Sequence, residues 1–368
     1  MTCKFGGATI PVIPDTSPTP KPLWRRILRV LGLFPLYFIA VLITVWASAA
    51  LYIDLRFPLV KHLAGFSYAL LVVFLATRIS GHWKRFLMCA GCFVLVLLWW
   101  LGLKPSNYRT WEPDLAETPW AEIDGNQITL HGFRFCHYRT EFDYTCEWLT
   151  KSLDLSRLRG IDLAITYWGS PYIAHPILSF QFGDHEYVAA SIETRKEMGE
   201  GYSAILGFFR QYELVYVFAD ERDLIRLRTN YRKGEEVYLF HTNAEPPWAQ
   251  ELFLEYLRRA NRLRDHPKWY NALTRNCTTV IFRSMADMGS LPPGTSLHNW
   301  RVILNGRGDE MLYKGGNFEG NLPFPELKES ARINAAARQA DQDPEFSLRI
   351  REGRPGFEKG NEGVKEKH

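Results

Sequence analysis

The sequence predicts an α+β domain, an antiparallel sheet with helices packed on it, behind a helical membrane anchor. Three observations predict this class: long uncharged runs near the N-terminus, short alternating β runs after them, and amphipathic helical stretches later in the chain. The 368 residues are 46% hydrophobic and 14% aromatic, which is enough apolar material for one or two folded domains. The net charge is only +4 and the basic residues are spread along the chain, so nucleic acid is not an expected partner.

The N-terminal part is expected to cross a membrane three times. Apolar runs with few charges predict spans at about 30–53, 59–79 and 86–103, within a membrane region of residues 24–104. Each run approaches the ~20 residues needed to cross the hydrocarbon layer. The second run reaches this length only if its flanking residues join it.

Positive charges set the expected orientation of the anchor. A cluster of arginines precedes the first run, which favours a cytoplasmic N-terminal segment, residues 1–23, and an exported domain after Lys104. The basic residues between the second and third runs oppose this orientation. If the second run does not cross, the large domain lies in the cytoplasm instead. A cleaved signal peptide is not expected, because the first run is too long and more membrane follows it.

The residues after the anchor predict a linker, a globular domain and a tail. The linker is expected at 105–119, the domain at 120–352 and a disordered, charged tail at 353–368. Alternation of apolar and polar residues predicts strands, and spacings of three and four residues predict helices. The expected strands are 127–138, 161–168, 175–183, 185–193, 212–220 and 235–242, and the expected helices are 220–232, 246–266 and 277–289.

Cys277, in "TRNCTTVIF", is the first candidate for chemistry. Asn276 and Thr278 both suit the start of a helix. A helix N-terminus favours a thiolate and presents backbone N–H groups, so Asn276 and Thr278 are expected to support an oxyanion beside Cys277. The local string alone fits a small buried cysteine equally well.

A thiol nucleophile also needs a base, and His175 is the best placed histidine, at the head of an apolar strand. His137 is a rival on an earlier strand. Antiparallel pairing outward from a turn at Asp184 places Glu193 opposite His175. Glu193 would then orient the imidazole, although a solvated charge at the strand edge explains it equally well.

Other chemistries have weaker support. Cys136 and Cys146 could form a disulfide in an exported domain, which the spacing alone does not settle. The sequence contains no Walker loop, no H-E-x-x-H and no G-x-S-x-G motif, so neither a metal nor an organic cofactor is expected. Arg195, Arg210 and Arg228 are candidates for contacts with phosphate or lipid headgroups, and each could equally be a solvated surface charge.

Several segments resemble the bacterial Lnb N-terminal periplasmic domain family, notably "SNYRTWEPD", residues 154–232 and "RNCTTVIF". The resemblance covers roughly Ser106 to Gly356. It implies a circularly permuted papain-like (NlpC-like) thiol fold in which the catalytic His precedes the catalytic Cys. Some members are lipoprotein N-acyltransferases, which move an acyl chain onto the α-amino group of a lipoprotein's N-terminal cysteine. By motif, His175 and Cys277 match the catalytic pair, and Glu193 the polar third member.

The expected function is therefore a membrane-anchored thiol acyltransferase or hydrolase in the bacterial inner membrane, with a periplasmic catalytic domain. Its expected partners are a membrane lipid as acyl donor and a lipoprotein or other cell-envelope substrate. Two alternatives remain open from the sequence. One is a cysteine peptidase or amidase that uses the same residues, and the other is a non-enzymatic membrane protein on the same fold.

Overall fold

The computed structural model describes residues 23–183, 185–296 and 306–357. The chain forms two compact units, Met1–Gly102 and Leu103–His368. Most of the expected cytoplasmic segment and most of the expected disordered tail lie outside the described residues.

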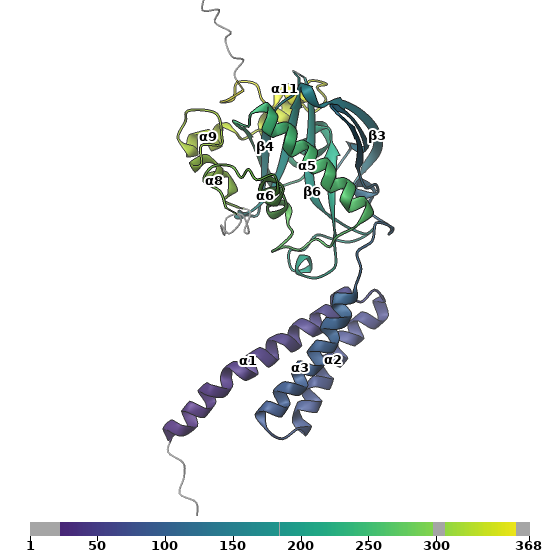
Figure 1. Ribbon diagram of the computed structural model, residues 1–368, viewed down its shortest axis with the longest axis vertical. Coiled ribbons are helices and arrows are strands. Elements are labelled where there is room, and N and C mark those ends of the chain that lie inside the picture. Colours follow the sequence, from purple (N-terminus) through teal and green to yellow (C-terminus); the bar gives the residue numbers. More distant parts are fainter. Residues whose placement is uncertain (1–22, 184, 297–305, 358–368) are drawn as a thin grey trace, which may run out of the picture. The chain divides into compact units, whose positions relative to one another are not determined.

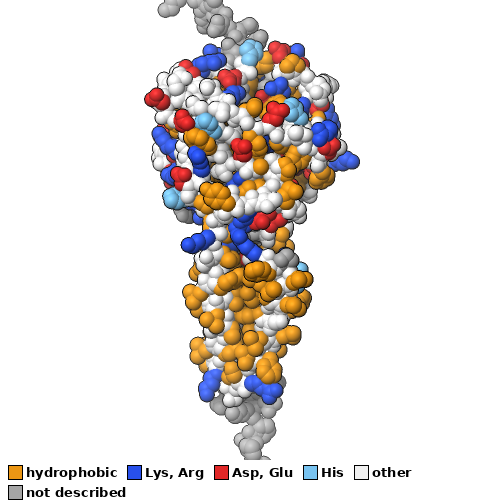
Figure 2. Space-filling view, turned by 90° about the vertical axis from the view of Figure 1, so that its right-hand side faces the viewer, with side chains coloured by type: hydrophobic (Ala, Val, Ile, Leu, Met, Phe, Trp, Pro, Cys, Tyr) orange, Lys and Arg blue, Asp and Glu red, His pale blue; other side chains and the backbone are white. Residues whose placement is uncertain are grey.

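The first unit consists of three long apolar helices, α1 (Leu23–Asp54), α2 (Pro58–Arg78) and α3 (His82–Gly102). All three are long and apolar enough to cross a membrane, with candidate spans of 24, 20 and 21 residues. The expectation of three candidate spans, including the doubtful second one, is confirmed by length and composition. Hydrophobic side chains cover the surface of these helices, whereas charged side chains are spread over the second unit (Figure 2).

Close packing joins the three helices. Gly65 of α2 lies so near α1 that a Cβ atom there would be only 2.8 Å from the Ser48 carbonyl oxygen. The Trp46 ring of α1 packs edge-on against Trp100 of α3, with 5.2 Å between ring centroids. Trp100 Nε1 also donates to the Asp54 carboxylate at 2.6 Å, so the buried acid at the end of α1 has a partner.

The second unit is built on an eight-stranded sheet in the order β1-β2-β7-β6-β5-β4-β8, with β3 paired to β2. Every pair is antiparallel except β2 with β7, which are parallel. The strands are β1 (Trp120–Asp124), β2 (Gln127–Tyr138), β3 (Tyr144–Asp154), β4 (Leu158–Trp168), β5 (Ser170–Phe182), β6 (Glu186–Arg195), β7 (Glu213–Ala219) and β8 (Glu235–His241). The predicted α+β class is therefore confirmed.

Helices cover both faces of this sheet (Figure 1). On one face α5 (Pro246–Asp265) and α6 (Cys277–Asp287) enclose a core with even-numbered side chains of the central strands, such as Leu178 and Ala190. On the other face α4 (Glu221–Arg226), α10 (Asn334–Gln339) and α11 (Phe346–Arg349) enclose a core with odd-numbered ones. The unit also contains two short helices, α8 (Gly308–Lys314) and α9 (Phe324–Ser330). Shorter helical segments are the 3-10 helices η1 (Pro113–Leu115), η2 (Leu155–Arg157) and η3 (Leu206–Phe208) and the π-helix η4 (Leu227–Tyr231).

The expected helix 220–232 is confirmed, with an α-helix to Arg226 that continues as the π-helix η4 to Tyr231. Two other segments differ from the sequence-based expectation. The expected linker is part of the folded unit, since Trp111 is buried and forms a β-bridge with Glu197. The predicted start of the tail, at residue 353, is too early, because Phe357 still packs on His241 with 5.0 Å between ring centroids.

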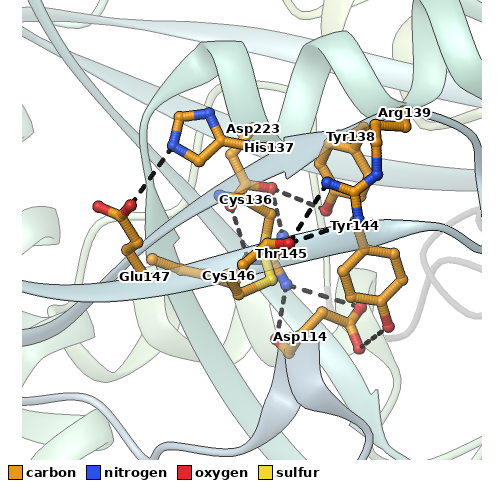
Figure 3. The surroundings of a disulfide bond; sticks show 11 residues. Asp114, Cys136, His137, Tyr138, Arg139, Tyr144, Thr145, Cys146, Glu147 and Asp223 are labelled. Carbon is orange, nitrogen blue, oxygen red and sulfur yellow. Dashed lines mark hydrogen bonds and ion pairs between the residues drawn. A yellow bond between two sulfur atoms is a disulfide. The ribbon is translucent and has the colours of Figure 1, made fainter.

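Cys136 and Cys146 form a disulfide between directly opposed positions of β2 and β3 (Figure 3). The backbone N–H of Cys136 donates to the buried carboxylate of Asp223 in α4, and Tyr138 donates to the same carboxylate. Arg134 forms a salt bridge with Asp223 at 2.7 Å. The disulfide hairpin is thereby tied to α4, which leads directly into η4.

The C-terminal segment is held to the sheet by a buried charge cluster. Arg351 lies 2.7 Å from the Asp162 carboxylate of β4 and 2.6 Å from the Glu221 carboxylate of α4. All three side chains are buried. The guanidinium offsets the burial of both carboxylates, and Asp162 also pairs with His241 at 2.6 Å.

We expect Arg351→Met to lower the free energy of unfolding by about 3–5 kcal/mol, because it leaves the buried Glu221 carboxylate without its cation and leaves Asp162 with His241 alone. Arg349→Met is the matched control. The Arg349 side chain is 47% exposed, so loss of its salt bridges should lower the free energy of unfolding by less than about 1 kcal/mol. Urea unfolding of both full-length variants in detergent, followed by tryptophan fluorescence, measures the difference. Equal midpoints for the two variants would contradict the structural role given to Arg351.

Candidate active site

Cys277 is the first residue of α6, and its neighbours fix where this helix begins. The Asn276 side chain accepts from the Thr279 backbone N–H at 2.8 Å, and Thr279 Oγ1 accepts from the Asn276 N–H at 2.9 Å. This reciprocal capping box holds Cys277 in the first turn, where backbone N–H groups and the positive end of the helix dipole lie.

The roles expected for Asn276 and Thr278 need correction. The side-chain N–H of Asn276 donates to the Ala272 carbonyl oxygen at 2.8 Å, so this amide serves as a cap and a brace for the preceding loop. Thr279, not Thr278, completes the capping box. The Thr278 hydroxyl is buried and has no hydrogen-bond partner among the described residues.

His175 and Glu193 meet across neighbouring strands. The pairing of β5 with β6 runs from Phe182 and Glu186 to Ile177 and Ser191, the register expected from a turn at residue 184. His175 Nε2 lies 3.1 Å from Glu193 Oε1. The prediction that these two residues are neighbours is therefore confirmed, whereas their catalytic role stays a prediction.

The pairing of β5 with β6 stops at Ile177 and Ser191, just before the His175 position. Beyond that point β5 pairs only with β4, and β6 only with β7. A cavity of about 200 Å³ lies here, and side chains from both faces of the sheet line it. His175 and Glu193 contribute from one face and Cys277 from α6 on the other, so the end of the strand pairing is what lets them meet.

Two further side chains complete a polar network that sequence reasoning missed. Ser191 Oγ lies 2.7 Å from His175 Nε2 and donates to Glu193 Oε1 at 2.7 Å. Arg228 of η4 donates to the same Glu193 oxygen at 3.1 Å and pairs with Glu235 at 3.4 Å. The period of two along β6 was the available signal for Ser191, because it places residues 191 and 193 on one face.

The surroundings of His175 favour its charged form. Burial by itself lowers the pKa of the imidazole, but the Glu193 carboxylate raises it. The positive charge of Arg228 lowers the pKa of His175, and the Cys277 side chain raises it by charge and by a hydrogen bond. The balance of these effects raises the pKa of His175 to about 9. Burial likewise opposes ionisation of Glu193, yet His175 and Arg228 hold its pKa well below the usual range. At neutral pH the pair is an imidazolium beside a carboxylate.

The sign of the pH dependence follows from these shifts. The folded-state pKa of His175 lies above its ordinary value of 6.5, so protonation of this ring stabilises the folded state. The contribution of His175 to the free energy of unfolding is fully present below about pH 6.5 and is lost as the pH rises through about 9.

Two tyrosines also border the cavity beside Cys277. Tyr202 and Tyr270 both line it. Burial, and then the charge of the nearby Cys277, raise the pKa of both phenols, so each keeps its proton at neutral pH. Nothing in the local sequence marked these residues, because they come from two loops that only the fold brings together.

The three arginines expected to contact a substrate have different surroundings. Arg195 is buried and binds the Leu115 and Ala116 carbonyl oxygens of the expected linker, at 2.9 and 2.8 Å, so the expected headgroup contact is wrong for this residue. Arg210 donates to the Leu103 carbonyl oxygen at 2.6 Å and is not part of the cavity lining. Arg228 lines the cavity, but its guanidinium is engaged with two carboxylates.

The rival histidine does not reach the cavity. His137 is exposed on β2 and lies 3.7 Å from Glu147 of β3 (Figure 3). Among the histidines weighed from the sequence, His175 is the one that lines the cavity with Cys277.

Comparison with known proteins gives one match. Residues 144–306 match the family model described as the Lnb N-terminal periplasmic domain, which confirms the resemblance noted in the sequence. This range contains Cys277, His175 and Glu193. No curated protein and no solved structure matches the chain.

We expect Glu193→Gln to lower the pKa of His175 from about 9 to its ordinary value or below. The substitution removes the carboxylate. Burial and Arg228, which both disfavour the imidazolium, then outweigh the smaller favourable contribution of Cys277. A pH titration of ¹³C-histidine-labelled protein by NMR, with the His175 signal assigned from His175→Gln, measures this. Glu197→Gln is the control, because Glu197 pairs with Arg109 instead. An unchanged His175 titration in Glu193→Gln would show that Glu193 does not control this ring.

Proposed function

Residues 144–306 match the Lnb N-terminal periplasmic domain family model, and three helices before them are long and apolar enough to cross a membrane. From these premises we propose that the chain is a membrane-anchored thiol acyltransferase or hydrolase. The proposed nucleophile is Cys277, and the proposed intermediate is a thioester. One observation carries the proposal: Cys277, His175 and Glu193 line a single cavity, in which the His175 imidazole lies 3.1 Å from the Glu193 carboxylate.

The first half-reaction would transfer an acyl group to the enzyme. The Cys277 thiolate attacks the carbonyl carbon of an ester and forms a C–S bond. As the tetrahedral intermediate collapses, the C–O bond breaks and the His175 imidazolium gives its proton to the leaving oxygen. The products are an acyl-Cys277 thioester and a free alcohol.

The second half-reaction would release the acyl group. His175, now neutral, takes a proton from an acceptor amine or from water as that group attacks the thioester. The C–S bond then breaks, and the thiolate and imidazolium are restored. An amine acceptor makes the enzyme a transferase, and water makes it a hydrolase. We propose a membrane lipid as acyl donor and a lipoprotein or other cell-envelope amine as acceptor.

The remaining groups would position the His175 ring and stabilise the oxyanion of the intermediates. Glu193 and Ser191 hold Nε2 of His175, which leaves Nδ1 as the nitrogen that we assign to the thiol. Arg228 keeps Glu193 ionised and in place. The backbone N–H of Cys277, at the start of α6, is the proposed donor to the oxyanion of each tetrahedral intermediate. Tyr202, whose hydroxyl stays protonated beside Cys277, is a further candidate donor.

Mass spectrometry of the full chain tests this function. We expect incubation with a phospholipid in mixed micelles to add one acyl mass to the Cys277 peptide, and His175→Ala to slow that addition by about 10²–10⁴-fold. Cys277→Ala should abolish the adduct. Cys89→Ala, which removes another free cysteine, should leave it unchanged.

Two results would count against the proposal. Lipid turnover that persists in Cys277→Ala would remove the thioester from the reaction. Cleavage of peptide or amide substrates without any lipid product would instead assign the same residues to a cysteine peptidase or amidase.

A further inference from the structure

Two loops beside the cavity expose large apolar side chains to solvent. Ile205 is 68% exposed and Phe208 41% exposed on the loop that contains η3, and Leu273 is 49% exposed on the loop before α6. Tyr202, also exposed, lies on the first of these loops and lines the cavity with Cys277. We call these four residues the apolar rim. Large apolar side chains that gather at the mouth of a site mark an interaction surface.

The two loops form one continuous surface. The Ala272 N–H donates to the Gly207 carbonyl oxygen at 2.8 Å, and the Asn271 side chain donates to the Phe208 carbonyl oxygen at 3.4 Å. A Cβ atom at Gly207 would lie 3.3 Å from both the Ala272 side chain and the Tyr270 ring. Glycine at this position therefore lets the loops pack closely enough for the rim to act as a unit.

Both loops also hold the residue at which the chain leaves its last candidate span. The Leu103 carbonyl oxygen accepts from Arg210 Nη1 at 2.6 Å and from Trp269 Nε1 at 3.3 Å. Arg210 follows η3 closely, and Trp269 lies four residues before Leu273. Leu103 is covalently bonded to Gly102, the last residue of α3 and of its candidate span. The loops that carry the rim thus hold the residue that directly follows the last candidate span.

We propose that the apolar rim inserts into the interfacial layer of the membrane that the chain itself spans, so that the cavity holding Cys277 opens at the lipid surface. Apolar and aromatic side chains with basic residues beside them suit this layer, and the exposed Lys104 and Lys268 supply such charge next to Leu103 and Trp269. The proposal goes beyond the proposed function, because it concerns where the domain docks and not which bond it breaks.

Lipid-mediated quenching tests the docking directly. The full chain, with all cysteines except Cys136 and Cys146 replaced by alanine, is given one new cysteine by Leu273→Cys and labelled with an environment-sensitive fluorophore. It is then reconstituted in vesicles of phosphatidylcholine and phosphatidylglycerol that contain a nitroxide-labelled phospholipid. Leu149→Cys is the matched control, since Leu149 is a leucine of similar exposure, 43%, on β3. Ile205→Cys provides a second rim position in case Leu273→Cys does not fold.

We expect the nitroxide lipid to quench the rim probes several-fold more than the Leu149 probe, and we expect aqueous iodide to quench them less. Equal lipid quenching at the rim and at Leu149 would overturn the proposal. Protection of the rim from iodide without lipid quenching would also overturn it, and would assign the surface to a protein partner. Because the labelled protein lacks Cys277, neither result depends on the proposed chemistry.

Discussion

The ion pair between His175 and Glu193 is the interaction on which the site depends. It joins two strands at the point where their hydrogen bonding ends. It lies in a partly enclosed cavity where Glu193 favours the charged imidazole, while His175 and Arg228 both favour the charged carboxylate. A register shift of one residue would turn either side chain to the opposite face of the sheet and separate the pair. The hairpin register, fixed by the apolar cores on both faces, is therefore also what fixes the geometry around Cys277.

Several elements of the second unit support this pair. Arg228 reaches Glu193 from η4, which continues α4, and α4 is anchored to the disulfide hairpin through Asp223. Arg195, two residues after Glu193 on β6, donates hydrogen bonds to the Leu115 and Ala116 carbonyl oxygens in the segment that follows α3. A short covalent and hydrogen-bonded path thus runs from the end of α3 to the strand that carries Glu193. That path suits an enzyme whose proposed acyl donor stays in the membrane.

Sequence reasoning succeeded where the signal was local. The turn after Gly183 and the alternation around it gave the β5–β6 register, and the Asn276 cap gave the start of α6. It missed β3, in which only one residue is buried and whose apolar pattern is therefore weak. It also missed the burial of Arg195 and the contact between Arg228 and Glu193. Both depend on segments far apart in the chain, and no local pattern predicts which distant segment will cover a charged side chain.

Alkylation of Cys277 across pH, in the full chain and in His175→Ala, tests the central proposal that Cys277 and His175 work as a pair. An ordinary thiol, with a pKa of about 8.5, reacts slowly at about pH 6. The account predicts rapid labelling of Cys277 at about pH 6 and a large loss of that labelling in His175→Ala. If the two proteins label Cys277 with the same pH profile, the two side chains do not work as a pair, and Cys277 is a structural cysteine at the start of a helix.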